Sequence, residues 1–250
     1  WQGLGYYNRA RNLQKAARQI MEQFGGQFPR SYPDLLSLAG VGDYTAGAIA
    51  SIAFGLPEPA VDGNVLRVVT RITGDPSDIS QAATKKVIRA ALAEVIPLQA
   101  PGDFNQALME LGALVCLPNG APDCAHCPAH EFCAAHLTGK TAQIPVKGAK
   151  KPRKIEERTV YLLFHCGQVA LRRRPAKGLL AGLWEFPNAE GALDEAAAGA
   201  AVKAMGLTPV DWRSRLAAKH IFTHVEWHMT GFVLTVQGNG PAEFLWADRE

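Results

Sequence analysis

The sequence has no apolar run of the roughly 20 residues that a helix needs to span a bilayer, and no pattern of a secretory signal peptide. It begins with Trp rather than Met. Acidic and basic residues nearly balance, with 23 Asp and Glu against 26 Lys and Arg, so the formal net charge is only +3. We therefore expect no membrane partner, and any nucleic-acid binding must depend on local groups rather than on bulk charge.

Charge is distributed unevenly along the chain. Residues 1–137 hold 10 Lys and Arg against 12 Asp and Glu, residues 138–158 hold 7 against 2, and residues 159–250 hold 9 against 9. The first segment shows helical periodicity, as in 12–24, with short connections. The middle segment has two Pro, two Gly and many Lys without apolar periodicity, which predicts a basic linker.

The third segment has a different pattern from the first. Residues 159–164 and 169–172 are predicted to be paired strands, 192–205 an Ala-rich helix, and 230–236 and 244–246 further strands. Strands mixed with one helix indicate a small α+β domain. The sequence thus predicts two domains of different class.

Four of the five cysteines form a C-x7-C-x2-C-x5-C array: Cys116, Cys124, Cys127 and Cys133. Thiolates bind soft metals and iron–sulfur clusters, and short spacings bring four of them to one point. The loop is rich in Pro and polar residues, so it offers little apolar core for structural cysteines. The spacing leaves open an iron–sulfur cluster or a four-cysteine zinc site, and the neighbouring His126, His130 and His136 are interpreted as surface residues.

The segment LAGVGDYTA, residues 38–46, lies between two predicted helices. Gly40 and Gly42 flank Val41 and permit a tight hairpin, because glycine adopts positive φ without steric cost. Backbone N–H groups at the start of the next helix could then hold a DNA phosphate without a lysine. A plain helix–turn–helix connection explains the pattern equally well, so both interpretations stay open here.

Asp62 lies in the segment AVDGNV, directly before a helix predicted over 63–73. For an isolated Asp in this position, N-capping is the simpler interpretation. The alternative is a carboxylate placed beside a sugar that develops positive charge.

The order and spacing of these three features resemble the helix-hairpin-helix DNA glycosylases that carry an iron–sulfur loop, the superfamily of endonuclease III and MutY. The resemblance runs from Trp1 to about His136 and includes the opening WQGLGYYNRARNL. It implies a [4Fe–4S] cluster on the four cysteines of the loop 116–133, although the first gap is x7 where the superfamily usually has x6.

One position distinguishes the branches of this superfamily. Its bifunctional lyases carry a Lys two residues after the second hairpin glycine, where the amine forms a Schiff base with the sugar. Here that position is Tyr44, a common residue there in MutY-type adenine DNA glycosylases. The resemblance therefore implies a monofunctional glycosylase of that type.

The resemblance also implies roles for individual residues. Asp62 is the catalytic carboxylate that stabilises oxocarbenium charge at C1′ of the deoxyribose or traps it covalently, and Tyr44 and Asn64 help to place the sugar, the intermediate or the water. DNA contacts are expected from four residues: Gly40, Val41, Gly42 and Tyr6. For Tyr6, an aromatic side chain packed in a helix interface is the alternative.

The acid that protonates the leaving adenine is, in the family, a Glu on a helix upstream of the segment that opens this sequence. No residue here matches that Glu. We therefore expect the chain to begin partway through the catalytic domain and, taken alone, to bind DNA poorly and not to catalyse.

The C-terminal segment supports the MutY branch, because LWEFP at 183–187 resembles the start of a Nudix motif. A Nudix hydrolase continues with an R-E-x-x-E-E helix that binds Mg²⁺. The matching positions here are Gly199, Ala200, Lys203 and Ala204. The metal carboxylates are missing, so hydrolysis of a nucleotide is not expected.

Phe222, Thr223 and His224 match the F-S-H loop with which this domain of MutY-type enzymes helps to recognise 8-oxoguanine, and Thr keeps the hydroxyl of Ser. The competing idea is a metal site of His220, His224 and His228. That site needs one helix, whereas the residues between them look like loop and strand.

The predicted fold is thus a mainly α helix-hairpin-helix glycosylase domain (1–137), a basic linker (138–158) and an α+β Nudix-like 8-oxoguanine-recognition domain (159–250). The predicted function is hydrolytic removal of adenine mispaired with 8-oxoguanine or guanine in base excision repair. We expect a monomer that acts on double-stranded DNA. Its expected location is the cytoplasm of a bacterial cell, in association with DNA. The alternatives are an endonuclease III-type glycosylase and lyase, or a non-catalytic zinc DNA-binding module.

Overall fold

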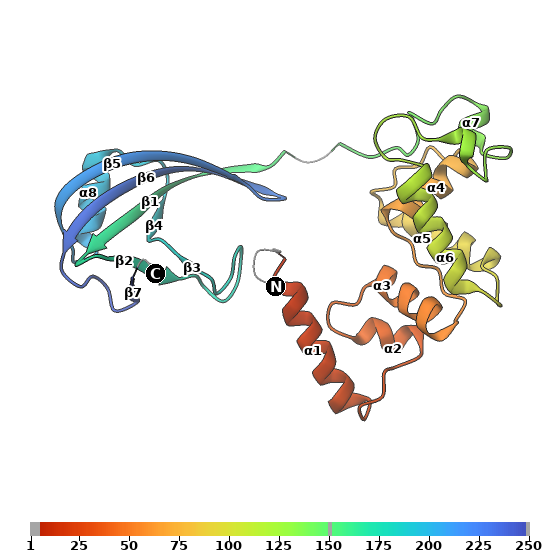
Figure 1. The fold of residues 1–250 in the computed structure, drawn as a ribbon, viewed down its shortest axis with the longest axis horizontal. Helices are drawn as coiled ribbons and strands as arrows, with labels where there is room; N and C mark the ends of the chain where they lie inside the picture. Colours follow the sequence, from red (N-terminus) through yellow and green to blue (C-terminus); the bar gives the residue numbers. More distant parts are fainter. Residues whose placement is uncertain (1–5, 150–151, 249–250) are drawn as a thin grey trace. The chain divides into compact units, whose positions relative to one another are not determined.

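A computed structural model describes residues 6–149 and 152–248. The chain divides into two compact units, Trp1–Ala149 and Lys150–Glu250 (Figure 1). The residues WQGLG, which open the sequence motif shared with the glycosylases, lie outside the described part.

The first unit is helical. Its elements are α1 (Asn8–Gln23), α2 (Tyr32–Ser37), α3 (Asp43–Ala48), the π-helix η1 (Ile49–Ala53), α4 (Gly63–Thr73), α5 (Ala82–Val95), α6 (Pro101–Glu110), the π-helix η2 (Leu111–Val115), the 3₁₀-helix η3 (Cys124–His126) and α7 (Ala134–Leu137). The helical stretch that follows the glycine hairpin is therefore an α-helix continued by a π-helical turn. A π-helix widens the backbone locally and often marks a functional site.

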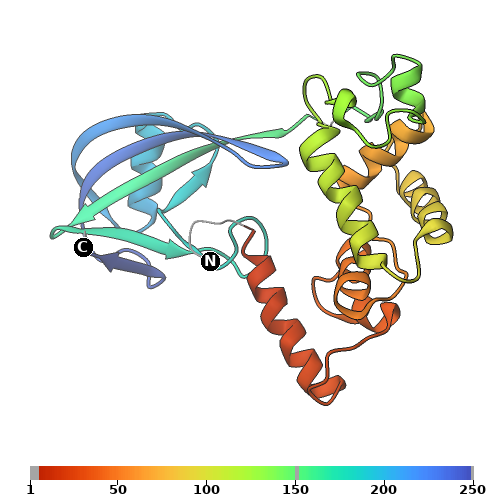
Figure 2. The same cartoon turned by 45° about the vertical axis from the view of Figure 1, so that its right-hand side comes forward.

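Two apolar clusters hold this unit together. One joins α1, α2 and α3, with Leu35 and Ala46 fully buried at its centre. The other joins α4 to α5 and α6 around Val65, Leu66 and Ile88. In Figure 2 α4 and α6 lie side by side, and Phe104 and Leu108 of α6 pack against this second cluster.

The predicted linker 138–158 is not a free tether in the structure. Its first part packs on the helical unit, where Ile144 is 4% exposed and the backbone N–H of Ile79 donates to the Val146 carbonyl at 3.0 Å. Its last five residues belong to strand β1, which begins at Lys154. These contacts are made with residues far away in the sequence, so the segment shows no apolar period of its own.

The second unit contains one mixed sheet. Its elements are β1 (Lys154–His165), β2 (Gln168–Arg173), β3 (Trp184–Glu185), β4 (Asn188–Glu190), α8 (Glu195–Ala204), β5 (Thr208–Ile221), β6 (Val225–Gln237) and β7 (Phe244–Ala247). The strand order is β3-β2-β1-β6-β5, while β4 pairs with β1 and β7 with β2. β1 and β6 run parallel, with Lys154 opposite Val225 and Phe164 opposite Thr235.

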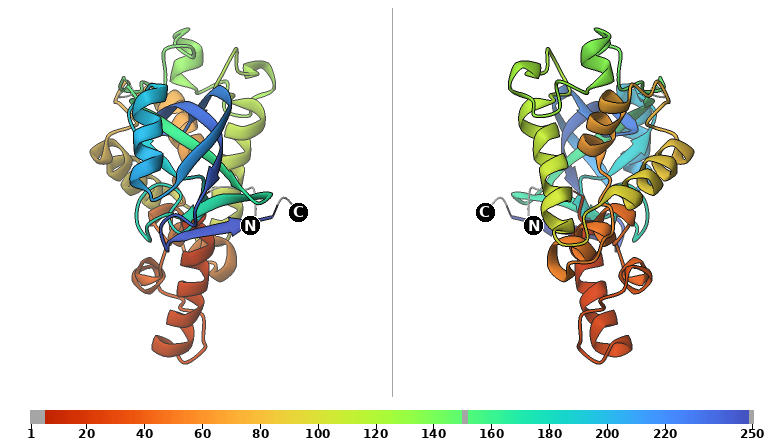
Figure 3. Two further views of the ribbon diagram at one scale, coloured as in Figure 1. Left: turned by 90° about the vertical axis from the view of Figure 1, so that its left-hand side faces the viewer. Right: turned by 90° about the vertical axis from the view of Figure 1, so that its right-hand side faces the viewer.

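Helix α8 lies against one face of the sheet (Figure 3). Ala198 and Val202 of α8 join Tyr161, Phe232 and Leu234 of the central strands in one buried core. The sequence patterns missed β5, because most of its side chains are exposed and show no alternation. β5 forms through its antiparallel pairing with β6, which extends from Thr208–Gln237 to Ile221–Glu226.

Candidate active site and cysteine loop

The glycine hairpin at 40–42 leads into α3. Gly40 has φ +80°, and a Cβ at this position would lie 2.7 Å from the Cβ of Asn12 on α1, so glycine is required there for both conformation and space. Gly42 is the extended N-cap of α3, and its carbonyl accepts from the Ala46 N–H at 2.8 Å. The N–H groups of the first turn of α3 precede this first intrahelical bond, as at any helix start.

A polar cluster lies beside the hairpin. The Tyr32 hydroxyl donates to Asp43 Oδ1 at 2.9 Å, and burial together with this hydrogen bond raises the pKa of Tyr32 to about 12. Arg89 lies 4.3 Å above the Tyr32 ring and pairs with Glu58 at 2.6 Å. These contacts connect the start of α3 to α2 and α5.

Tyr44 lies in the first turn of α3 and is 42% exposed. Its hydroxyl contacts Met109 Sδ on α6 at 3.7 Å. Among the described residues, no hydrogen bond joins Tyr44 to Asp62. Tyr6 lies just before α1, is 72% exposed and has φ +46°.

Asp62 is the N-cap of α4. Its Oδ1 accepts the Val65 N–H at 2.8 Å, and its Oδ2 accepts from Asn64 Nδ2 at 3.1 Å. The carboxylate is half-buried. The simpler interpretation, a helix cap, therefore describes Asp62 correctly, but the cap also fixes the direction of a carboxylate that keeps further lone pairs.

Asn64 connects this carboxylate to a buried cation that sequence analysis missed. Asn64 Oδ1 accepts from Arg67 Nη2 at 2.9 Å, and Arg67 also donates to the Gly112 and Cys116 carbonyls, each at 2.7 Å. Arg67 is 4% exposed, and burial lowers the pKa of its guanidinium. Gly112 permits this packing, because a Cβ there would lie 2.6 Å from Asn64 Cβ.

Arg71 lies one turn further along α4 and is also 4% exposed. Its Nη1 donates to Cys116 Sγ at 3.2 Å and to the Leu117 carbonyl at 3.0 Å, and its Nε donates to the Ile144 carbonyl at 2.7 Å. The pattern in the sequence that could have identified both residues is a pair of Arg at i and i+4 in an otherwise apolar helix after Asp62.

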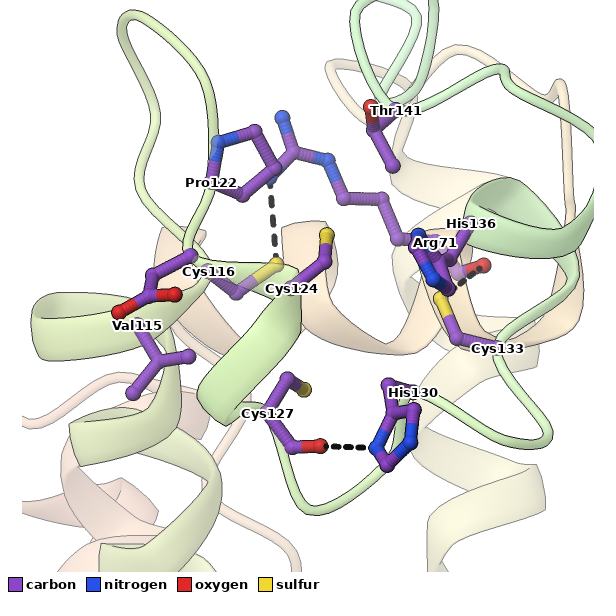
Figure 4. Close-up of a pocket in the computed structure, with 11 residues that line it drawn as sticks. Arg71, Val115, Cys116, Pro122, Cys124, Cys127, His130, Cys133, His136 and Thr141 are labelled. Carbon is purple, nitrogen blue, oxygen red and sulfur yellow. Dashed lines mark hydrogen bonds between the residues drawn. The ribbon is translucent and has the colours of Figure 1, made fainter.

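The four predicted cysteine ligands line one cavity (Figure 4). Cys133 is buried and its Sγ donates to the Arg71 carbonyl at 3.3 Å, while the other three thiols are half-buried. Burial, followed by the neighbouring Cys127, raises the pKa of the Cys124 thiol. Four thiols and one guanidinium around a single cavity are a donor set that fits an iron–sulfur cluster.

A single zinc ion needs ligand atoms that converge to about 2.0–2.3 Å from one point. No three His, Cys, Asp or Glu side chains in the described residues form a group that could hold one ion. His130 and His136 line the cavity, whereas His126 is 83% exposed and pairs with Asp123 at 2.9 Å.

In the second unit, Phe222, Thr223 and His224 form the turn between β5 and β6. The Phe222 N–H donates to the Val225 carbonyl at 2.8 Å, and Thr223 and His224 are exposed. His220 and His228 lie on β5 and β6, so these histidines do not share one helix. The His228 ring contacts Glu226 at 2.7 Å.

The four positions that match the Nudix metal motif lie on α8 or at its end. The only acidic residue of α8 is Glu195 in its first turn. A Cβ on Gly199 would meet the Trp212 ring at 3.3 Å, so α8 presents small residues to an aromatic side chain here.

None of the described helices combines the length and the apolar character that crossing a membrane requires.

Comparison with known proteins gives two family matches, a Nudix domain over residues 159–250 and a helix-hairpin-helix motif over residues 23–52. The chain is 37% identical over 234 residues to adenine DNA glycosylase of Homo sapiens, covering 75% of this chain and 43% of that protein. It is 40% identical over 202 residues to the Arabidopsis thaliana enzyme, covering 75% and 32%. The chain thus spans about half or less of the length of these curated relatives.

Among solved structures, a non-covalent endonuclease III–DNA complex matches with 31% identity and a TM-score of 0.46, over 55% of this chain and 61% of that chain. The helix-hairpin-helix motif lies in the helical unit, the Nudix domain follows it in the unit with the mixed sheet, and the sequence identities are to adenine DNA glycosylases. The chain belongs to the family of MutY-type adenine DNA glycosylases.

Proposed function

We propose that the full-length protein removes adenine mispaired with 8-oxoguanine or guanine from double-stranded DNA by hydrolysis of the N-glycosidic bond, acting as a monomer. The observation that carries this proposal is the Asp62 carboxylate, oriented by Val65 N–H and Asn64, in a chain that is 37% identical to a curated adenine DNA glycosylase. Adenine is flipped out of the base stack so that the bond can be reached.

Asp62 stabilises the transition state. Loss of adenine builds oxocarbenium character on the deoxyribose at C1′, and an ionised carboxylate next to that atom lowers the energy of the developing charge. The two hydrogen bonds to Asp62 hold its carboxylate in one orientation. Asn64, held in turn by Arg67, keeps its amide directed at Asp62.

Tyr44 supports a monofunctional reaction. A lyase of this superfamily needs an amine at this position for its Schiff base, and a phenol cannot form one. The half-exposed Tyr44 hydroxyl is instead available to place the sugar or the attacking water. The product is therefore free adenine and an abasic site with an intact strand.

The hairpin of Gly40, Val41 and Gly42 binds a DNA phosphate. The Cβ position of Gly42 has open space within 4 Å, so a phosphate can approach the backbone at this point. The N–H groups that start α3 supply donors without a lysine, which agrees with the slightly acidic count of residues 1–137. Tyr6, exposed before α1, contacts bases near the lesion.

Cys116, Cys124, Cys127 and Cys133 would hold a [4Fe–4S] cluster. When bound, this group supplies structural and electronic stabilisation of the loop and no hydrolytic chemistry. Arg71 donates to one of the ligand sulfurs, and its positive charge offsets the negative charge of thiolates.

In the second unit, Phe222, Thr223 and His224 contact 8-oxoguanine on the opposite strand.

The test separates the two roles of Asp62, helix cap and catalytic carboxylate. Asp62→Asn keeps a good N-cap but removes the charge, whereas Asp62→Ala loses the cap, at a cost of about 1 kcal/mol of stability. We expect Asp62→Asn in the full-length protein to fold and bind an A:8-oxoguanine duplex normally while adenine release is abolished. Adenine release at the wild-type rate in Asp62→Asn would show that Asp62 is only a cap.

A further inference from the structure

The Phe222–His224 turn accepts hydrogen bonds from the residues that lead into β1. Arg153 Nε donates to the Phe222 carbonyl at 3.1 Å, and the Lys154 N–H donates to the His224 carbonyl at 3.2 Å. The Phe222 N–H closes the turn on the Val225 carbonyl at 2.8 Å. Two carbonyls of a three-residue turn thus receive hydrogen bonds from two consecutive residues of the basic segment.

The Phe222 side chain is held on its other side by aromatic packing. Its ring lies 4.9 Å from Trp227 at 71° and 4.4 Å from His220 at 63°, both edge-on arrangements. Trp227 is 8% exposed, and its Nε1 donates to Glu156 Oε2 at 3.0 Å. Packing against these two aromatic side chains therefore restricts the position of the Phe222 ring.

The backbone of the turn is held at its carbonyls. Thr223 and His224 are exposed, and the hydrogen bonds to the Phe222 and His224 carbonyls fix the backbone on both sides of Thr223. The Lys154 bond is a backbone hydrogen bond at the start of the pairing between β1 and β6. The Arg153 guanidinium adds a side-chain hydrogen bond to the same turn. Arg153 stands in the segment whose positive charge is the highest of the chain, 7 basic against 2 acidic residues.

We propose that Arg153 is a positioning residue for the Phe222–His224 turn and thereby sets the preference for 8-oxoguanine over guanine. This inference rests on the proposed function of the turn. It assigns to the end of the basic segment a role other than that of a tether or a general attraction for phosphates. Arg153 acts through the Phe222 carbonyl and need not touch the modified base.

The experiment uses the full-length protein with Arg153→Met, which keeps an apolar stem without a donor, and Arg153→Lys, which keeps the charge without the planar guanidinium. The matched control is Arg173→Met, because Arg173 Nε makes a similar exposed hydrogen bond to the Gly182 carbonyl at 3.2 Å. Dissociation constants are measured for duplexes with A:8-oxoguanine and A:G mispairs over a range of salt concentrations. Hydrogen exchange of the Phe222 amide is measured without DNA.

We expect the preference for 8-oxoguanine to fall about three- to tenfold in both Arg153 variants, the effect of losing one hydrogen bond, and to stay unchanged in Arg173→Met. The Phe222 amide should exchange faster in both variants. Affinity for the A:G duplex and the slope of log K against log salt should not change, whereas loss of a phosphate contact would reduce that slope by about 0.9.

Three results would overturn the inference: a preference that survives in both variants, an unchanged Phe222 exchange rate, or a reduced salt slope with equal loss on both duplexes. A wild-type protein that shows no preference for 8-oxoguanine is a different outcome, because it refutes the proposed function of the turn itself and the inference with it.

Discussion

Removing the Arg67 guanidinium is expected to destabilise the helical unit and to slow adenine release beyond the loss of folded protein. Arg67 is 4% exposed, and its three shortest hydrogen bonds go to the Asn64 side chain and to the Gly112 and Cys116 carbonyls. Arg67→Met fills much of the same volume but leaves these three acceptors without this donor. Each buried acceptor left unpaired costs about 1–3 kcal/mol.

The structure around the substituted side chain relaxes in part, so the total cost is smaller than the sum over the three acceptors. We expect a loss of about 3–5 kcal/mol in the free energy of unfolding. This is a large part of the roughly 5–15 kcal/mol that a domain has. The assay is urea unfolding followed by far-UV circular dichroism. The control is Arg89→Met, because Arg89 and Glu58 form a pair in which each side chain is about 30% exposed, and such pairs contribute about 1 kcal/mol or less.

The catalytic part is measured by single-turnover adenine release at a temperature where Arg67→Met is folded, with the rate divided by the folded fraction. Because Asn64 loses the donor that holds its Oδ1, we expect the corrected rate to fall about tenfold or more, while binding to the mispaired duplex is retained. A corrected rate equal to that of wild type would refute the link from Arg67 through Asn64 to Asp62. Stability equal to that of Arg89→Met would refute the energetic reasoning.

Three further predictions concern other parts of the molecule. Hydrogen bonds from Lys154, Arg158 and Trp227 hold the pKa of Glu156 at about 2, below its ordinary 4.5. The contribution of ionised Glu156 to the stability of the second unit is therefore fully present above pH 4.5 and is lost as the pH falls toward 2. Glu156→Gln should reduce the difference in thermal stability of this unit between pH 5 and pH 2.5. Gly112→Ala should cost about 1–3 kcal/mol by overpacking, because its Cβ would meet Asn64 at 2.6 Å, while Gly63→Ala, with open space, should leave urea unfolding nearly unchanged. The purified protein should absorb near 400 nm with about four irons per chain and lose both in Cys127→Ser; bound zinc alone would contradict the cluster.

Local patterns in the sequence were sufficient to predict features that depend on neighbouring residues. The helix over Gly63–Thr73 follows from an N-cap Asp, an apolar period and a terminal Gly, and the structure has the same bounds. The glycine hairpin and the four cysteines around one cavity follow from spacings of a few residues. The Nudix-type fold of the second unit follows from a short motif and alternating strands.

Contacts between distant residues could not be predicted in this way. β5 is exposed along most of its length, shows no alternating pattern and forms through its pairing with β6. The local pattern predicts a linker over 154–158, whereas these residues start β1, because their pairing partners from Val225 onwards lie about 70 positions later in the chain.

The same division holds within the candidate site. The sequence predicts an N-cap at Asp62, and it shows that position 44 carries a phenol and no amine. The contacts that hold Asn64 and the cysteine loop are visible in the folded structure alone, because Arg67 and Arg71 donate to carbonyls 45 and 73 positions away. Side chains buried between helices are selected by three-dimensional packing and hydrogen-bond satisfaction, and neither quantity has a short period that a one-dimensional pattern can show.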